Sequence, residues 1–406
     1  MRVAVVGGGS TYSPELVSGL GALDVDRVTL IDPDEDRLAV VGPFCRRLLP
    51  GRVEWTSDLD AGLRGADVVV IQLRVGGQRA RISDETFPMA CGCVGQETTG
   101  AGGFAKALRT VPVVLDVARR ARELAPDAWL VCFTNPVGIV TRALLDDGHR
   151  ALGLCNVAIG VQRHLARLLA VEPAAVVLDH AGLNHLTWVR AATVDGVDRL
   201  PELLATRAAE LAAQLDLPAA AIALTGTLPS YYLRYFYCHD EVVDRDRGAP
   251  TRGERVAEIE RELLAMYADP ALDHKPDLLG QRGGAFYSEA AVGLLRSLRS
   301  GDGAVHAVDV RNDGTLPFLP DEAVVEVSCR VGTDGPVPLP TTLAPDQAGL
   351  VAHVAAYEEL AVEAAVRGGE DRVRRALLAH PLTGQLDRVE ALTGGLLAAN
   401  PGIADR

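Results

Sequence analysis

Several features that would define a specialised class of protein are missing from this 406-residue sequence. No apolar segment approaches the roughly 20 residues that a helix needs to cross a bilayer, and there is no internal repeat or low-complexity segment. The first apolar run begins at residue 2, which leaves no room for a secretory leader. We therefore expect a soluble, cytoplasmic protein with no membrane partner.

Cysteine pairs and an excess of positive charge are also missing. The seven cysteines are an odd number without CxxC spacing, which favours free thiols in a reducing compartment over a disulfide scaffold. A formal net charge of -14 argues against nucleic acid or an anionic membrane as a partner, since both would repel the chain. An anionic small substrate stays compatible, because a few well-placed arginines can dominate locally.

What the sequence does contain is a regular alternation of apolar runs and helical stretches over its first 155 residues or so. Hydrophobic residues make up 48% of the chain, enough for two packed domains. Continuous apolar runs are typical of parallel strands that are buried on both faces, and this alternation predicts an α/β fold with a doubly wound, Rossmann-type sheet. The predicted strands are Arg2–Val6, Arg27–Asp32, Ala66–Leu73 and Trp129–Thr134, with helices over Pro14–Leu20 and Arg109–Leu124.

The alternation ends near residue 165. Val176–Leu178 and Thr187–Val194 resemble antiparallel strands, and Gln347–Val366 and Gln385–Leu397 have the spacing of amphipathic helices. We therefore expect a Rossmann-type domain over residues 1–165 and a mixed α+β domain over residues 166–406.

A glycine-rich turn follows the first strand. Gly7, Gly8 and Gly9 adjoin Ser10, and glycines between a strand and a helix let backbone N–H groups approach a pyrophosphate. Asp32 closes the second strand, where a carboxylate can bind a ribose diol and would repel the 2′-phosphate of NADP. The turn predicts NAD binding, although Tyr12 replaces the third glycine of the usual fingerprint and a plain glycine turn is the alternative.

Two polar clusters follow apolar strands. Cys155 and Asn156 lie in a predicted turn, and His185 just precedes a predicted strand; a thiolate and an imidazole could hold a divalent metal between them. Asn135 follows the Trp129–Thr134 strand, where ligands of such sheets bind. The alternatives are a buried thiol with a structural histidine, and a simple Asn-Pro turn.

Tyrosine and arginine clusters complete the set of candidates. The run SYYLRYFY at 230–237 holds four of the eight tyrosines; it is typical of a core or an interface, or it supplies a base whose pKa a nearby metal or arginine lowers. We predict polar loops over Arg74–Glu85 and Gly95–Gly103. The first carries three arginines that could clamp a phosphate or could simply be solvated.

Taken together, these segments resemble glycoside hydrolase family 4. The resemblance runs in family order from residue 3 to about residue 328 and resumes near residue 377. Its pieces are VVGGGSTYSPEL, IDPDEDRL, GGQRARISDE, VGQETTGAGGF, FTNPVG, GLCNVAIG, GLNHL, YYLRYF, QRGGAFYS, VRNDGTLPFLPDEAVVEV and ALLAHPL.

The resemblance implies an NAD- and Mn²⁺-dependent hydrolase of phosphorylated glycosides, a family that departs from the two-carboxylate mechanism. It implies oxidation of the sugar at C3, removal of the C2 proton, loss of the aglycone, addition of water and re-reduction at C3. The metal would act as a Lewis acid on the C2 and C3 oxygens. Tyr232 matches the catalytic tyrosine, with Tyr231 as the alternative one residue earlier.

The resemblance also implies roles for other residues. Cys155 and His185 match the metal ligands, Asn135 and Asn156 match substrate contacts, and Arg81 and Arg252 match arginines that bind the 6-phosphate. Asn156 after the cysteine resembles the 6-phospho-β-glucosidase branch, and a homodimer or homotetramer is expected from the family and from apolar faces of the C-terminal helices.

Two departures lie beside the sugar site: Val137 replaces a frequent serine and Ala158 a usual proline. They leave the sugar epimer open. A family 4 hydrolase of another anomer or of an unphosphorylated glycoside is one alternative. A malate-type dehydrogenase would share the N-terminal fold, and a non-catalytic NAD sensor would leave the metal, tyrosine and arginine clusters without a role.

Overall fold

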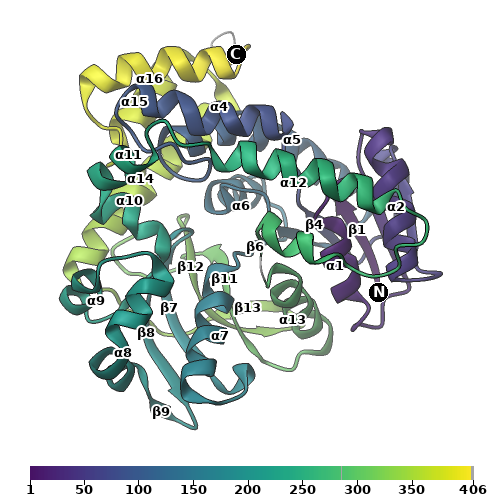
Figure 1. The fold of residues 1–406 in the computed structure, drawn as a ribbon, viewed down its shortest axis with the longest axis horizontal. Coiled ribbons are helices and arrows are strands. Elements are labelled where there is room, and N and C mark those ends of the chain that lie inside the picture. Colours follow the sequence, from purple (N-terminus) through teal and green to yellow (C-terminus); the bar gives the residue numbers. More distant parts are fainter. Residues whose placement is uncertain (285, 404–406) are drawn as a thin grey trace.

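One mixed sheet of thirteen strands runs through the computed structural model, which describes residues 1–284 and 286–403 (Figure 1). The main path through the sheet is β10-β8-β7-β12-β11-β6-β5-β4-β1-β2-β3. One end of the sheet is therefore built by the N-terminal segment and the other by the segment after residue 176.

The six strands β1 to β6 are parallel and lie in the order 3-2-1-4-5-6, which is the order of a doubly wound dinucleotide-binding sheet. All four residues of Val68–Ile71 are buried, as expected for a strand covered on both faces. The predicted fold class is confirmed. The strands are β1 (Arg2–Val6), β2 (Arg27–Ile31), β3 (Val53–Thr56), β4 (Val68–Ile71), β5 (Trp129–Cys132) and β6 (Ala151–Gly153).

Antiparallel strands extend this sheet at β6. β11 pairs with β6 through Asp309 and Gly153, and β12 then joins β11 to β7. The strands are β7 (Val177–Leu183), β8 (Leu186–Val194), β9 (Val197–Asp198), β10 (Leu228–Pro229), β11 (Val305–Arg311), β12 (Val324–Gly332) and β13 (Gly335–Pro338). Strand β11, which begins more than 150 residues after the end of β6, thus pairs with the last strand of the parallel half and extends the sheet.

Helices from both halves share the faces of this sheet. Among the described residues, the N-terminal helices are α1 (Ser13–Leu20), α2 (Glu35–Leu48), α3 (Leu59–Leu63), α4 (Gly77–Ala90), α5 (Gly100–Leu124), α6 (Val137–Asp146) and α7 (Val157–Leu169). The later ones are η1 (Pro173–Ala175), α8 (Leu200–Leu215), α9 (Ala219–Thr225), η2 (Tyr231–Leu233), α10 (Arg234–Tyr237), α11 (His239–Asp246), α12 (Arg252–Tyr267), η3 (Asp277–Arg282), α13 (Tyr287–Ser300), α14 (Pro345–Arg367), α15 (Glu370–Ala379) and α16 (Leu386–Ala399). Within residues 1–284 and 286–403, no helix has the length and apolar character to cross a membrane.

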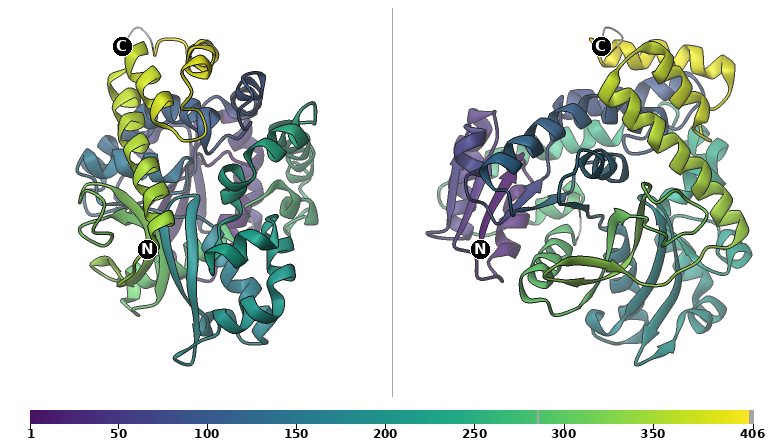
Figure 2. Two further views of the ribbon diagram at one scale, coloured as in Figure 1. Left: turned by 90° about the vertical axis from the view of Figure 1, so that its left-hand side faces the viewer. Right: turned by 180° about the vertical axis from the view of Figure 1, so that it is seen from behind.

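The second half packs directly on the first. Helix α12 lies against α2 and α4, α13 lies against α1, and α14 lies against α5 and α6. The helices α14, α15 and α16 gather at one end of the molecule beside α5 (Figures 1 and 2). One cluster of buried apolar residues contains members from Val3 to Ile403. The expected domain boundary near residue 165 stays a prediction.

The two predicted polar loops are partly wrong. Most of Arg74–Glu85 lies in helix α4, and Gly100–Gly103 form the first turn of α5. Their polar side chains pair inside the protein: Asp84 is fully buried against Arg109. Gly102 lies so close to the Asp84 carbonyl oxygen that an added Cβ would be 2.3 Å from it. Tertiary ion pairs and close packing therefore stabilise helices that local composition does not indicate.

Candidate active site

The glycine turn between β1 and α1 is packed tightly on β2. The backbone N–H groups of Gly7 and Gly8 both donate to the carbonyl oxygen of Ile31 at 2.9 Å. Gly7 has a φ of +87°, and a Cβ on Gly8 would lie 2.6 Å from the Cβ of Leu30. Because only glycine fits both positions, the backbone leaves the space over the turn open, as a dinucleotide requires.

Asp32 lies directly after β2 beside this turn. Its two carboxylate oxygens accept hydrogen bonds from the backbone N–H groups of Gly9 and Asp34, each at 3.0 Å. The side chain is half-buried, and each oxygen has a further lone pair for a ribose hydroxyl. Ser10 lies next in the turn and its hydroxyl accepts from the N–H of Tyr12. The residues at this turn fit NAD.

An arginine that the sequence interpretation missed lies over the same turn. Arg282, at the end of η3, donates to the hydroxyl oxygen of Thr11 at 2.6 Å and to that of Ser10 at 3.3 Å. Burial lowers the pKa of Arg282, although Glu260 beside it acts in the opposite direction. The QRGGAFYS segment was the available signal, but nothing local indicates that it folds back over Ser10 from 272 positions away.

Cys155 and His185 lie at the ends of two strands, β6 and β7, that β11 and β12 separate in the sheet. Cys155 follows β6, and His185 occupies the two-residue turn between β7 and β8 with a φ of +67°. Both are buried, and the Asn184 side chain lies beside the Cys155 thiol. The structure therefore brings together the two predicted metal ligands around one asparagine.

The neutral state of His185 fits metal binding, whereas the Cys155 thiol would need the charge of a cation to ionise. Burial lowers the pKa of His185 to about 4, so the imidazole is neutral at physiological pH, and its Nδ1 is buried without a hydrogen-bond partner. Burial raises the pKa of the Cys155 thiol, as does the nearby Glu326. In the described part of the chain no three His, Cys, Asp or Glu side chains are grouped as a metal site.

Tyr232 lies over His185. The two rings are stacked with centroids 3.7 Å apart and planes 17° apart, and the ring of Tyr231 stacks on Tyr232 at 4.2 Å. Burial raises the pKa of Tyr232 well above 10.0, and Tyr231 and Cys155 raise it further. Burial thus opposes the lowered pKa that a tyrosine base needs, so such a base would depend on a cation.

The two predicted asparagines follow adjacent parallel strands. Asn135 lies after β5, before a cis peptide bond to Pro136, and its Oδ1 is buried without a hydrogen-bond partner. Asn156 lies after β6 at the N-terminus of α7. The carboxyl ends of such strands are where doubly wound sheets bind ligands, so both residues lie at the expected edge of the sheet.

The two predicted phosphate-binding arginines meet where α4 packs on α12. Arg81 is ion-paired with Glu85 at 2.8 Å and with Glu97 at 3.2 Å. Arg252 donates only to the carbonyl oxygens of Gln281 and Arg282, and within the described ranges no carboxylate pairs with it. Burial lowers the pKa of Arg252, and so does the positive charge of Arg81. This guanidinium is therefore available to an anion.

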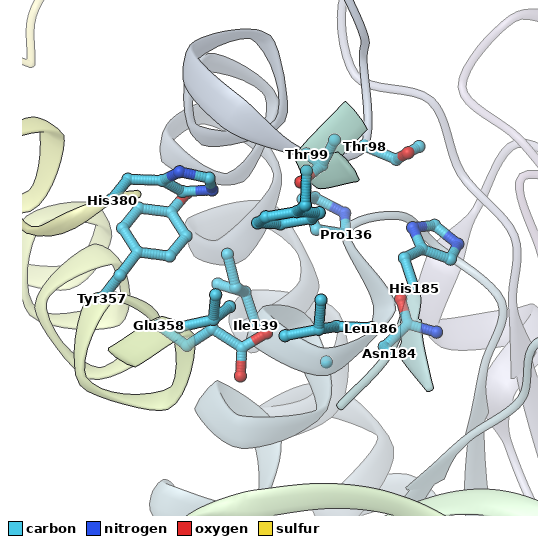
Figure 3. A pocket seen from close by; sticks show the side chains of 13 residues that line it. Thr98, Thr99, Pro136, Ile139, Asn184, His185, Leu186, Tyr357, Glu358 and His380 are labelled. Carbon is cyan, nitrogen blue, oxygen red and sulfur yellow. The ribbon is translucent and has the colours of Figure 1, made fainter. Parts of the chain in front are cut away.

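A small cavity of about 20 Å³ lies beside His185, enough for about one water. Figure 3 shows Asn184 and His185 on one side of it and Tyr357 and His380 on the other. Glu358 lies between them, and burial raises its pKa to about 8. The turn that carries His185 therefore forms part of the wall of this cavity.

Two family models match the sequence. The model described as "Family 4 glycosyl hydrolase" matches residues 2–171, and "Family 4 glycosyl hydrolase C-terminal domain" matches residues 180–383. A probable 6-phospho-β-glucosidase of Bacillus subtilis (strain 168) is 36% identical, over 94% of this chain and 92% of the relative. The 6-phospho-β-glucosidase of Escherichia coli (strain K12) is 33% identical, over 100% of this chain and 97% of the relative.

A solved structure is similar over almost the whole fold. The 6-phospho-β-glucosidase of Thermotoga maritima, determined with manganese, NAD⁺ and glucose-6-phosphate, has a TM-score of 0.93 and 33% sequence identity. The similarity covers 98% of each chain. The likeness therefore extends through both the parallel and the antiparallel parts of the sheet.

Proposed function

The chain belongs to family 4 of the glycosyl hydrolases and is a glycosidase, and on this premise we propose that it is a 6-phospho-β-glucosidase that uses NAD and Mn²⁺. Both relatives and the solved structure described above carry that activity in their names. Cleavage would proceed through oxidation at C3, loss of the C2 proton, elimination of the aglycone, addition of water at C1 with return of a proton to C2, and return of the hydride to C3. When bound, NAD supplies a hydride acceptor and the divalent cation a Lewis acid.

The observation that carries this proposal is the convergence of Cys155, His185 and Tyr232. Cys155 and His185 offer a sulfur and a neutral imidazole to one cation, and Tyr232 is stacked on the same imidazole. We assign Tyr232 as the base that takes the C2 proton, because a cation held by these ligands counteracts the burial that raises its pKa. An ordinary dehydrogenase needs no such group.

The remaining residues bind and orient the substrate and the dinucleotide. Arg252 and Arg81 hold the 6-phosphate by charge-assisted hydrogen bonds, and Asn135 offers its unpaired Oδ1 to a sugar hydroxyl; Asn156 is assigned a second sugar contact. The turn formed by Gly7, Gly8, Gly9 and Ser10 holds the pyrophosphate of NAD, and Asp32 holds the adenosine ribose.

The organisation of the molecule follows from these roles. We assign NAD binding to residues 1–165, and substrate binding, metal binding and oligomerisation to residues 166–406, as a homodimer or homotetramer. Seven free cysteines are consistent with a cytoplasmic enzyme. The alternatives of a malate-type dehydrogenase and an NAD sensor are not favoured, because the matching family models and relatives are glycosidases.

The decisive experiment is hydrolysis of a 6-phospho-β-glucoside in D₂O, with NAD and Mn²⁺ each added or withheld. We expect cleavage only with both, one deuterium at C2 of the released sugar phosphate, and no net NADH. Matched 6-phospho-α- and unphosphorylated β-glucosides serve as controls. Cleavage without either cofactor, or NADH formed in proportion to product, would refute the proposal.

A further inference from the structure

A buried carboxylate lies behind the Cys155–His185 pair and has no role in the function proposed above. Glu326 belongs to β12, in the strand position paired with Gly182 of β7, and only 1% of its surface is exposed. A buried carboxylate is costly unless its oxygens are hydrogen-bonded. The partners of this carboxylate therefore indicate what it stabilises.

Each oxygen of Glu326 binds one side chain of the β7–β8 hairpin. Its Oε1 lies 2.7 Å from Nε2 of His180, within β7. Its Oε2 accepts a hydrogen bond from Nδ2 of Asn184 at 2.7 Å. One carboxylate thus joins the strand that precedes the turn to the first residue of the turn itself.

That turn is the element that presents His185. Leu183 pairs with Leu186 across it, so only Asn184 and His185 form the connection. His185 has a φ of +67°, in a region that residues other than glycine rarely adopt, so its conformation must be held by its surroundings. A fixed Asn184 side chain restricts the turn and with it the direction of the imidazole.

Asn184 also reaches the second candidate ligand. Its side chain lies beside the Cys155 thiol, and an amide has two N–H donors. With one N–H donated to Glu326, the direction of the whole amide is restricted by that carboxylate. Glu326 therefore acts on the surroundings of the sulfur through Asn184.

We propose that Glu326 is a positioning residue for the divalent-cation site: it orients Asn184 and the β7–β8 turn so that Cys155 and His185 meet one cation. This inference rests on the proposed function for the assignment of Cys155 and His185 as ligands. Carboxylates that orient metal-binding side chains commonly change metal affinity by 10- to 100-fold when they are replaced.

The test measures Mn²⁺ binding without turnover, from the loss of the free Mn²⁺ electron paramagnetic resonance signal on titration into the NAD-bound protein. In Glu326→Gln the negative charge is lost, and an amide N–H₂ either faces the Asn184 donor or requires His180 to accept in its other tautomer, so we expect about 10- to 100-fold weaker Mn²⁺ binding. Glu326→Asp retains the charge and should recover part of the affinity. NAD affinity, measured by fluorescence, should stay within twofold of wild type.

The control is Glu358→Gln, which replaces another buried carboxyl that lines the neighbouring cavity but has no hydrogen bond to the turn in the described residues. It should bind Mn²⁺ as wild type does. If Glu326→Gln does not fold, Asn184→Ala removes the same connection from the other side. In a double variant with Glu326→Asp the two losses should be less than additive.

The outcomes separate this inference from the proposed function. Wild-type Mn²⁺ affinity in both Glu326→Gln and Asn184→Ala, with Cys155→Ala defective, would overturn the positioning role alone. Full Mn²⁺ binding by Cys155→Ala would overturn the proposed ligands and this inference with them. Equal losses of NAD and Mn²⁺ binding in Glu326→Gln would indicate a general structural role and would also overturn it.

Discussion

At the scale of single residues, the site combines three side chains whose charged forms are disfavoured by burial in the protein interior. The Tyr232 phenol and the Cys155 thiol both have raised pKa values because they are buried, whereas His185 is kept neutral for the same reason. One divalent cation would favour the charged forms of the first two and needs the neutral form of the third. Binding of one cation would therefore link the protonation states of all three residues.

Tyr232→Phe should lower kcat by about 10²- to 10⁴-fold, the usual contribution of a general base, and should leave NAD binding intact. Steady-state kinetics and deuterium exchange at C2 check this prediction. Tyr231→Phe is the matched control, since its ring stacks on Tyr232, and it should change kcat less than tenfold. The opposite pattern would make Tyr231 the base.

Arg252→Gln should raise KM for a 6-phosphorylated substrate by about 10- to 100-fold with a smaller effect on kcat. The expected size corresponds to the roughly 1.5–3 kcal/mol of a hydrogen bond to a charged group. Arg261→Gln removes an exposed arginine from the same helix and should leave KM unchanged. An unaltered KM in Arg252→Gln would mean that the phosphate is held elsewhere.

At the scale of secondary-structure elements, polar groups are buried where helices meet. Helix α14 brings Glu358 against the start of α6, where its Oε1 would lie 3.1 Å from a Cβ on Gly138. Helix α4 buries Asp84 against α5. The first contact joins a helix after residue 165 to one before it, and the second lies within the N-terminal segment.

The pKa of Glu358 leads to a prediction about stability and pH. Burial raises this pKa from 4.5 to about 8 in the folded protein. Between these two values the unfolded chain releases a proton that the folded chain keeps, so the free energy of unfolding should fall as the pH rises from about 4.5 to about 8. Each pKa unit corresponds to about 1.36 kcal/mol, so the effect is a few kcal/mol at most.

Urea denaturation of wild type and Glu358→Gln at several pH values measures this effect. The variant has no carboxyl to titrate and should gain stability relative to wild type as the pH rises through the window. Glu258→Gln alters an exposed carboxylate on α12 that has no ion pair among the described residues and should follow the wild-type curve. A constant difference between Glu358→Gln and wild type would contradict the assignment.

At the scale of the whole molecule, the sheet joins a dinucleotide-binding half to a half that carries the turn with His185. NAD binds at the junction of β1 and β2 in our proposal, so it should stabilise the folded chain by mass action. At 100 times its dissociation constant the gain is about 2.7 kcal/mol. Differential scanning fluorimetry should record a higher Tm with NAD.

Asp32→Ala should reduce that Tm increase at a given NAD concentration, because it removes the acceptor for the ribose diol. Asp36→Asn, an exposed change in the first turn of α2, should behave as wild type. If NAD raised the Tm of Asp32→Ala as much as that of wild type, the dinucleotide would have to lie elsewhere.

Local order along the chain was enough to predict the doubly wound sheet, because buried parallel strands and a glycine turn before a helix are local patterns. The family resemblance, built from short motifs, predicted Cys155, His185 and Tyr232 as site residues, and the structure brings them together. Only the tertiary structure shows that α4 is a helix, since buried ion pairs with α5 offset its polar composition. Only the tertiary structure also shows the hydrogen bonds of Arg282 with Ser10 and of Asn184 with Glu326. Contacts between residues far apart in the chain leave no periodic pattern in a sequence.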